Sequence, residues 1–262
     1  MIRQTPSAVQ KALHLSFVGF SGGAMLLQIF AVAFSLSPQS NYFKNGSPLP
    51  LLAIILAAIA IGCGSANVFL SKRDPAEPQG KTSCYALLPA GVGLTISAIE
   101  LFCLEKSTVA TLGIIFTLLG AVYCILPLFN DPLPGTVSVF FCFAAIAGCA
   151  SLTLCHYFDF TVELNAPLKL GLQIAWLLAM LFFTGDARAQ LTGTSSTVYR
   201  IVAVCTITVG AMVSIPTIFA FILGKIDRID FFAHAIAMLG ITISAILRAI
   251  PRTHSSKAED LP

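Results

Sequence analysis

Eight apolar runs, each close to the length that crosses a lipid bilayer, constrain the fold of this chain more than any other feature. A spanning helix needs about 20 predominantly apolar residues, because each residue adds about 1.5 Å and the hydrocarbon core is about 30 Å thick. The runs cover residues 16–36, 49–70, 85–104, 110–129, 136–154, 168–184, 201–223 and 231–247. They predict an all-α polytopic transmembrane bundle of about eight helices, arranged as four hairpins in one integral membrane domain over residues 1–262.

Composition excludes a water-soluble fold and favours the lipid bilayer as the surroundings of the chain. Of the 262 residues, 56% are apolar and only 10% are charged, whereas a soluble domain carries about 25% charged residues. The net charge of +3 comes from dispersed basic residues, so no basic face for nucleic acid is expected.

Two of the runs have alternative interpretations. The first follows Arg3 and Lys11 and contains Ala31-Val32-Ala33, which is loosely similar to a signal-peptide cleavage site. Its apolar stretch is longer than the 7–15 residues of a signal core, so an uncleaved helix is expected. The run 168–184 is short and contains Lys169, whose ammonium group can reach the headgroups from the end of a span.

The distribution of basic residues predicts that both termini lie in the cytoplasm, because the more positive side of a membrane protein is retained there. One side carries ten of them: Arg3, Lys11, Lys72, Arg73, Lys81, Arg188, Arg200, Arg248, Arg252 and Lys257. The other side carries five: Lys44, Lys106, Lys169, Lys225 and Arg228.

Ionisable residues near the outer ends of the spans are the candidate substrate or coupling-ion site. Glu100 lies four residues before Leu104, about 6 Å from the end of its helix, and an acidic group in hydrocarbon is a functional candidate. Alternatively, it reaches the interface or pairs with Lys106. His156 and His234 are expected at the same depth as Glu100.

The two histidines are bordered by acidic residues, namely Asp159, Glu163, Asp227 and Asp230. Imidazole and carboxylate groups can bind a cation or relay a proton, so Asp230 joins Glu100 and the histidines as a candidate. The alternative is a pair of interfacial histidines beside a solvated acidic rim. No spacing has a metal-ligand signature and no second histidine pair serves a haem, so neither a metal nor a cofactor is expected.

Pro216 is the remaining candidate, because a proline inside a span kinks the helix and frees a carbonyl group. Its helix also carries Thr206, Thr208, Ser214 and Thr217. A kinked polar helix can line a cavity, and the alternative is ordinary kinked packing.

Small residues and cysteines are interpreted as packing residues. The small-x-x-x-small pattern, which lets helices approach closely in lipid, occurs at Ala58, Gly62 and Ala66; at Gly93 and Ser97; at Ala144 and Gly148; and at Gly210 and Ser214. The eight cysteines form no Cys-x-x-Cys pair and fall within or beside apolar runs, as small apolar side chains do.

No enzymatic motif is present, and an enzyme is not the expected function. The tetrapeptide Gly185-Asp186-Ala187-Arg188 follows the sixth run and lacks the further residues of an intramembrane aspartyl protease or a phosphatidyl-alcohol transferase. We interpret Gly185 as a helix C-cap, with Asp186 and Arg188 in a solvated turn. Phosphate-loop, zinc-hydrolase and serine-hydrolase signatures are likewise missing.

The stretch Phe158-Asp159-Phe160-Thr161-Val162-Glu163-Leu164-Asn165-Ala166-Pro167-Leu168-Lys169, which runs on toward Gly185-Asp186-Ala187-Arg188, resembles uncharacterised multi-pass membrane proteins of Gram-positive bacteria. The resemblance covers a short part of the chain. It implies a location in a bacterial plasma membrane, and it carries no activity and no site residues.

Two functional hypotheses follow from the sequence. The first is a transporter or permease-like subunit for a small solute or cation, working by alternating access with Glu100 as the candidate coupling group. The second is a non-transporting sensor or assembly module that binds a partner membrane protein.

Overall fold

The computed structural model describes residues 8–38, 42–44, 46–71, 85, 87–104, 108–125, 135–159, 166–192 and 195–249. Over these residues the fold is an all-α bundle of eight helices, with an isolated backbone bridge between Leu36 and Phe43. The helices are α1 (Ala8–Phe30), which continues as the π-helical turn η1 (Ala31–Ser35), α2 (Leu49–Leu70), α4 (Leu88–Leu104), α5 (Thr108–Ile125), α6 (Gly135–Phe158), α7 (Pro167–Thr192), α8 (Thr197–Ile222) and α9 (Ile229–Ala249).

The predicted helical membrane bundle is confirmed as a fold class. Six described helices are long and apolar enough to cross a membrane, whereas α4 and α5 are shorter apolar helices. Large apolar side chains lie on the outside of the bundle, among them Leu15, Phe69, Phe102 and Ile222, where lipid is their natural solvent. The chain is therefore a multi-pass membrane protein by the length, composition and surface of its helices.

Two helices extend about two turns beyond their apolar runs. Helix α1 begins at Ala8 and α7 continues to Thr192, each about eight residues beyond the predicted bound. Helix α7, which contains Lys169 and was predicted from a short run, is thus one of the longest helices of the described chain. Its extra turns carry Asp186 and Gln190, and these polar residues interrupted the hydropathy signal.

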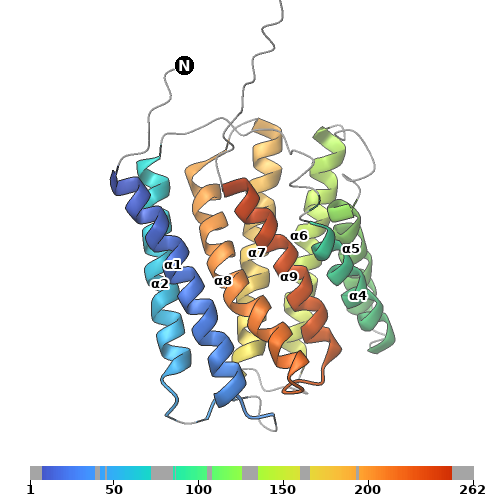
Figure 1. The fold of residues 1–262 in the computed structure, drawn as a ribbon. Helices are drawn as coiled ribbons and strands as arrows, with labels where there is room; N and C mark the ends of the chain where they lie inside the picture. The colour runs from blue at the N-terminus through green and yellow to red at the C-terminus, as the bar shows by residue number, and fades with distance from the viewer. Residues whose placement is uncertain are drawn as a thin grey trace, which may run out of the picture.

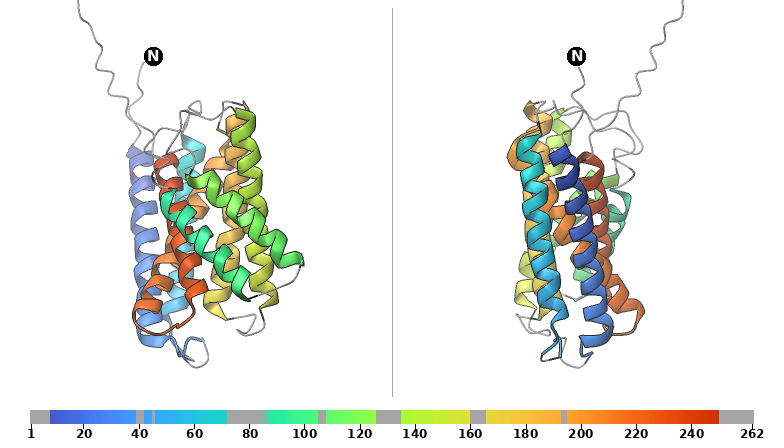
Figure 2. Two further views of the ribbon diagram at one scale, coloured as in Figure 1. Left: turned by 90° about the vertical axis from the view of Figure 1, so that its right-hand side faces the viewer. Right: turned by 60° about the vertical axis from the view of Figure 1, so that its left-hand side comes forward.

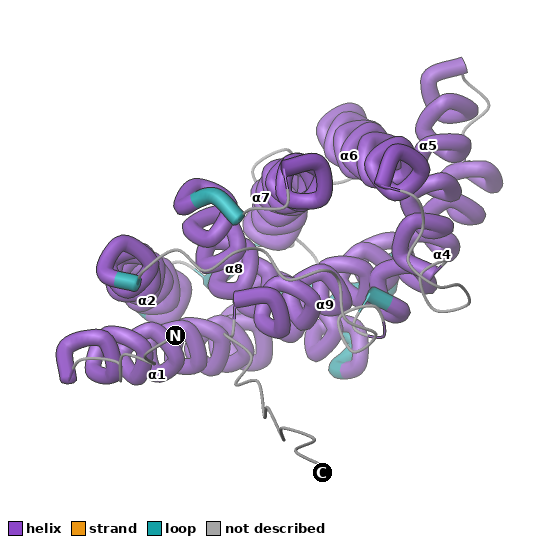
Figure 3. The backbone as a smooth tube through the Cα atoms, turned by 90° about the horizontal axis from the view of Figure 1, so that it is seen from above, coloured by secondary structure: helices purple, strands orange, loops and turns teal. Residues whose placement is uncertain are grey.

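The eight helices form four antiparallel hairpins, as predicted, namely α1–α2, α4–α5, α6–α7 and α8–α9 (Figure 1). Helices α4, α5, α6 and α7 follow one another in contact, and α9 closes the set by contacting both α4 and α7. We call these five helices, α4, α5, α6, α7 and α9, the helix ring (Figure 3). Helix α8 packs behind α7 and α9. The α1–α2 hairpin packs on α8 outside the ring.

The two ends of the bundle are defined by the chain direction. Helix α1 begins and α9 ends at the same end (Figures 1 and 2), which we call the terminal end; the other is the opposite end. This agrees with an even number of antiparallel helices. The cytoplasmic location of the terminal end stays a prediction.

Small residues let the helices of the ring approach closely. A Cβ atom on Gly93 of α4 would lie 2.5 Å from the backbone nitrogen of Ala237 in α9, and one on Gly148 of α6 would lie 3.0 Å from the Phe116 carbonyl oxygen of α5. These glycines therefore have the predicted packing role.

The predicted packing role of Ala58 and Gly62 in α2 is wrong. Ala58 and Gly62 are exposed, and nothing lies within 4 Å of a Cβ atom built on Gly62. The packed position is Gly64, where an added Cβ atom would lie 2.6 Å from Val204 of α8.

Candidate functional site

Two clusters of polar side chains lie inside the helix ring, one at each end. The terminal-end cluster is built around Asp186 of α7, which is only 4% exposed. Its other members come from four different helices and are Tyr123, Gln190, Tyr199 and Arg248.

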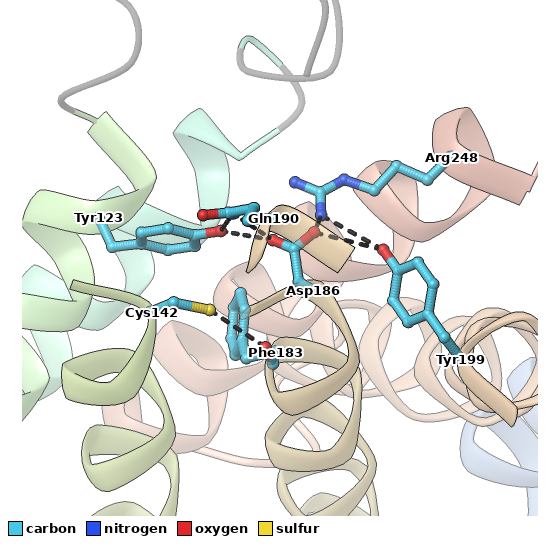
Figure 4. Close-up of polar contacts among 7 residues, drawn as sticks. All are labelled: Tyr123, Cys142, Phe183, Asp186, Gln190, Tyr199 and Arg248. Atoms are coloured by element: carbon cyan, nitrogen blue, oxygen red, sulfur yellow. Dashed lines mark hydrogen bonds and ion pairs between the residues drawn. The ribbon is translucent and has the colours of Figure 1, made fainter. Parts of the chain in front are cut away.

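Asp186 forms a buried ion pair with Arg248 of α9 (Figure 4). The Tyr123 hydroxyl donates to the second carboxylate oxygen, Oδ2, at 2.5 Å, and Gln190 Nε2 donates to the same oxygen at 3.4 Å. The Tyr199 hydroxyl lies 3.4 Å from Oδ1, which also accepts from Arg248. The carboxylate is thus held from α5, α7, α8 and α9, as a buried charge requires.

Aromatic rings cover the ion pair on its inner side. The Arg248 guanidinium group lies 5.4 Å from the centre of the Phe182 ring, within cation–π range. The Tyr123 ring packs edge-on against Phe183 at 5.7 Å. Cys142 of α6 is buried beside them and donates its thiol to the Phe183 carbonyl oxygen at 3.1 Å.

The interpretation of Gly185 as a helix C-cap with Asp186 in a solvated turn is wrong. Helix α7 runs through both residues, and a Cβ atom on Gly185 would collide with the Tyr199 ring. Glycine is present because Tyr199 packs against the helix backbone there. The spacing of Asp186 and Gln190, one turn apart on one face, was the sequence signal for a continuing polar face.

The opposite-end cluster contains the two histidines of the sequence prediction. His156 in the last turn of α6 and His234 in the second turn of α9 contact each other through Nε2 and Nδ1. They are 3% and 5% exposed. The alternative of interfacial histidines beside a solvated rim is therefore wrong, because the helix ring removes both rings from the surface.

A charged triad lies beside the histidine pair. Arg228, in the connection between α8 and α9, forms ion pairs with Asp159 at 2.8 Å and with Asp230. Burial lowers the pKa of Arg228, but hydrogen bonds and charge from Asp230 and Asp159 outweigh that effect and raise it. The fully buried Lys169 adds a bond from its Nζ to the Asp159 carbonyl oxygen, which replaces the predicted reach to the headgroups.

Glu100 of α4 is half-buried and faces the same cluster. Asp230 and Arg228 are its electrostatic neighbours, and the backbone N–H of Asp230 lies within hydrogen-bonding reach. Glu100 Oε2 is buried without a hydrogen-bond partner among the described residues. Four predicted residues, Glu100, His156, His234 and Asp230, thus meet at one end of the ring.

Between the two clusters, α7 presents two side-chain nitrogen atoms that have no hydrogen-bond partner in the described part of the chain, on Gln173 and Trp176. Lys169, Gln173 and Trp176 share one face of α7, at spacings of four and three residues. Trp176 is fully buried, and its ring lies edge-on to His234 with centroids 5.5 Å apart. Neither Trp176 Nε1 nor Gln173 Nε2 has a hydrogen-bond partner among the described residues. Sequence reasoning missed both residues.

Pro216 is buried in α8 and stands apart from this arrangement. The hydroxyl groups of Thr206, Thr208 and Thr217 donate to carbonyl oxygens four residues earlier in their own helix. Thr208 also bonds to Ser21 of α1. These three hydroxyls are satisfied within the bundle, whereas the buried Ser214 Oγ has no hydrogen-bond partner among the described residues. Lys106 and Glu163 lie outside the described residues.

Comparison of the chain with protein-family models, with curated proteins and with solved structures finds no match.

Proposed function

We propose that this protein transports a small solute across the membrane, with the helix ring as the route and α7 as the helix that contacts the solute. The observation that carries the proposal is the row of buried polar atoms on α7 between two closed ionic clusters. Gln173 and Trp176 have nitrogen atoms with no partner among the residues that the structure describes, whereas Asp186 on one side and the charged triad on the other are paired.

Unpaired donors inside a bilayer are costly, which favours a ligand role for them. A buried donor without an acceptor costs about 1–3 kcal/mol, and a buried tryptophan N–H normally has a partner. Trp176 is 0% exposed and lies about 14 Å along α7 from Pro167. A solute with an acceptor oxygen would satisfy this N–H, and Gln173 one turn away would orient the solute.

In alternating access a central site opens to one side of the membrane at a time. The two clusters lie where the two gates of such a site are needed. Each gate joins helices that also border the site: Asp186 and Arg248 connect α7 to α9, and His156 and His234 connect α6 to α9. Opening either gate would expose the α7 face from that side.

One observation favours the second candidate, an assembly module that binds another membrane protein. Ala58 and Gly62 lie one turn apart on the outer face of α2, and Gly62 has open space in front of it. Small residues at this spacing let a second helix approach. A stoichiometric membrane-protein partner that is lost in Gly62→Leu would favour this candidate.

The first experiment for transport is a ligand screen by thermal stability of the detergent-purified protein against cations, amino acids, sugars and nucleosides. Binding to the folded state raises apparent stability by mass action, by about 2.7 kcal/mol at a ligand concentration 100 times Kd. A hit is then tested for uptake into proteoliposomes.

Matched variants locate the binding site. Gln173→Leu and Trp176→Phe should abolish or weaken the shift at least tenfold in ligand concentration. Gln10→Leu makes the same change on α1, where Gln10 donates to the Leu70 carbonyl oxygen at an exposed position, and should leave the shift intact. A screen without any saturable hit would refute the transport proposal. Cytoplasmic termini and a bacterial plasma membrane stay predictions.

A further inference from the structure

We propose that His156 and His234 together form a binding site for one added proton at the opposite end of the helix ring, with its charge shared through the hydrogen bond between the two rings. As a coupling ion for transport this proton rests on the proposed function, but proton binding by the pair does not. The site is made by two helices that are far apart in the sequence, and neither histidine has the same surroundings without the other.

The contact between the rings allows only one proton between them. His156 Nε2 faces His234 Nδ1 within hydrogen-bonding distance, with ring planes nearly perpendicular at 88°. A neutral imidazole carries one N–H donor and one acceptor nitrogen, whereas an imidazolium carries two donors. The facing nitrogens form a bond only when one is protonated and the other is not.

Counting protons gives the capacity of the pair. Two neutral rings hold two protons on four nitrogens, and one of these protons lies in the bond between the rings. A third proton can bind to an outward-facing nitrogen and leaves that bond intact, now charge-assisted and roughly twice as strong. A fourth would protonate both facing nitrogens, which would then repel each other. The assembled pair therefore takes up one proton and no more.

Charged groups of both signs surround the pair. Arg228 and Lys169 are the cations that face the pair, from the connection before α9 and from α7. Asp230 of α9 and Asp159 at the end of α6 are the facing anions, and Glu100 of α4 faces Asp230 and Arg228. Two cations and three carboxylates thus border the site.

The position of the proton links it to the solute site. Trp176, whose N–H has no partner over the described ranges, packs edge-on against His234 with ring centroids 5.5 Å apart. A charge on the pair would therefore be felt by any acceptor group bound to the Trp176 N–H. A proton here is placed to attract an oxygen-bearing solute, and its departure weakens that attraction.

The test is a proton count by nitrogen NMR of protein labelled with ¹⁵N-histidine. The sequence has four histidines, so His14→Gln combined with His254→Gln leaves only the pair. Melting at each pH confirms that the protein stays folded. We expect the ¹⁵N chemical shifts of both rings to change together as the pH is lowered, with one midpoint. The total uptake should be one proton per chain. Glu100→Gln should keep this single-proton transition, because the proton resides on the imidazoles.

Two results would overturn the proposal. One is uptake of two protons with separate midpoints in the folded protein, and the other is no uptake at any pH where the protein remains folded. In His234→Gln the joint change of two rings must give way to a titration of His156 alone with a different midpoint, because glutamine can bond to His156 but cannot share the added charge. A one-proton transition with a null solute screen would reject the transport proposal alone, since the proton site is measured without any solute.

Discussion

Replacing Arg248 by methionine should destabilise the protein strongly, because it leaves the Asp186 carboxylate buried without its cation. The two side chains are 11% and 5% exposed, and breaking a buried ion pair typically costs about 3–5 kcal/mol. Tyr123 still donates to Asp186 at 2.5 Å in this variant. We therefore expect Arg248→Met to cost about 3 kcal/mol, the lower end of that range.

The reverse change should cost more. Asp186→Leu removes the acceptor of Arg248 and of the Tyr123 hydroxyl at once, so we expect about 4–5 kcal/mol. The double variant places two apolar side chains against each other and leaves no unpaired charge. Its cost should be about 1–3 kcal/mol, chiefly from the Tyr123 hydroxyl that has lost its acceptor.

The assay is equilibrium unfolding in mixed micelles with increasing SDS, followed in both directions to establish reversibility. A double-mutant cycle then isolates the interaction energy of the pair. The expected coupling is at least about 3 kcal/mol. Single variants within about 0.5 kcal/mol of wild type, or a double variant whose cost equals the sum of the singles, would refute a buried ion pair at this position.

Three further predictions follow from the geometry. Tyr123→Phe should cost about 1.5–3 kcal/mol in the same unfolding assay, because the hydroxyl bonds to a charged acceptor; an unchanged midpoint would mean that this bond is absent. Gly93→Ala should cost about 1–3 kcal/mol through overpacking against α9, whereas Gly62→Ala should be neutral, since an added Cβ atom meets nothing within 4 Å; equal effects would contradict the packing of α4 on α9. The pKa of Arg228 is raised above its ordinary value, so its contribution to stability is fully present below that ordinary value and is lost only in strong alkali. The difference in melting temperature between wild type and Arg228→Gln should therefore contain no step from arginine titration between about pH 6 and pH 9. A plot of this difference against pH thus distinguishes the effect of the Arg228 charge from that of the histidine pair.

The number and order of the helices could be predicted from the sequence because hydrocarbon imposes a length on every spanning segment. The predicted bounds of α2 coincide with the observed helix, Leu49–Leu70. Helix α7 was cut short because Asp186 and Gln190 lower the local hydropathy, and hydropathy does not distinguish a polar residue that enters water from one that pairs inside the bundle. Arg248 was likewise counted as a loop charge, although it lies in the last turn of α9.

The opposite-end cluster was partly predictable and the terminal-end cluster was not. Placing Glu100, His156, His234 and Asp230 at one depth requires only the helical rise and the direction of each span. Depth does not say which helices are neighbours, so the contact between the two histidines depends on the observed packing of the helix ring. Asp186 was missed because a Gly-Asp pair after an apolar run normally ends a helix. Only the Tyr199 ring explains why Gly185 is there.

The shared helices of the two clusters make them mechanically dependent on each other. Helix α7 contributes Asp186 to the terminal-end cluster and Lys169 to the opposite-end cluster, and α9 contributes Arg248 and His234. Asp186 and Lys169 are 17 residues apart in one continuous helix, or about 26 Å. A rigid helix that tilts to break contacts at one end presses its other end against the ring, so both clusters cannot open easily at once. Arg248→Met should therefore alter the midpoint of the histidine transition, and an unchanged midpoint would show that the two ends move independently.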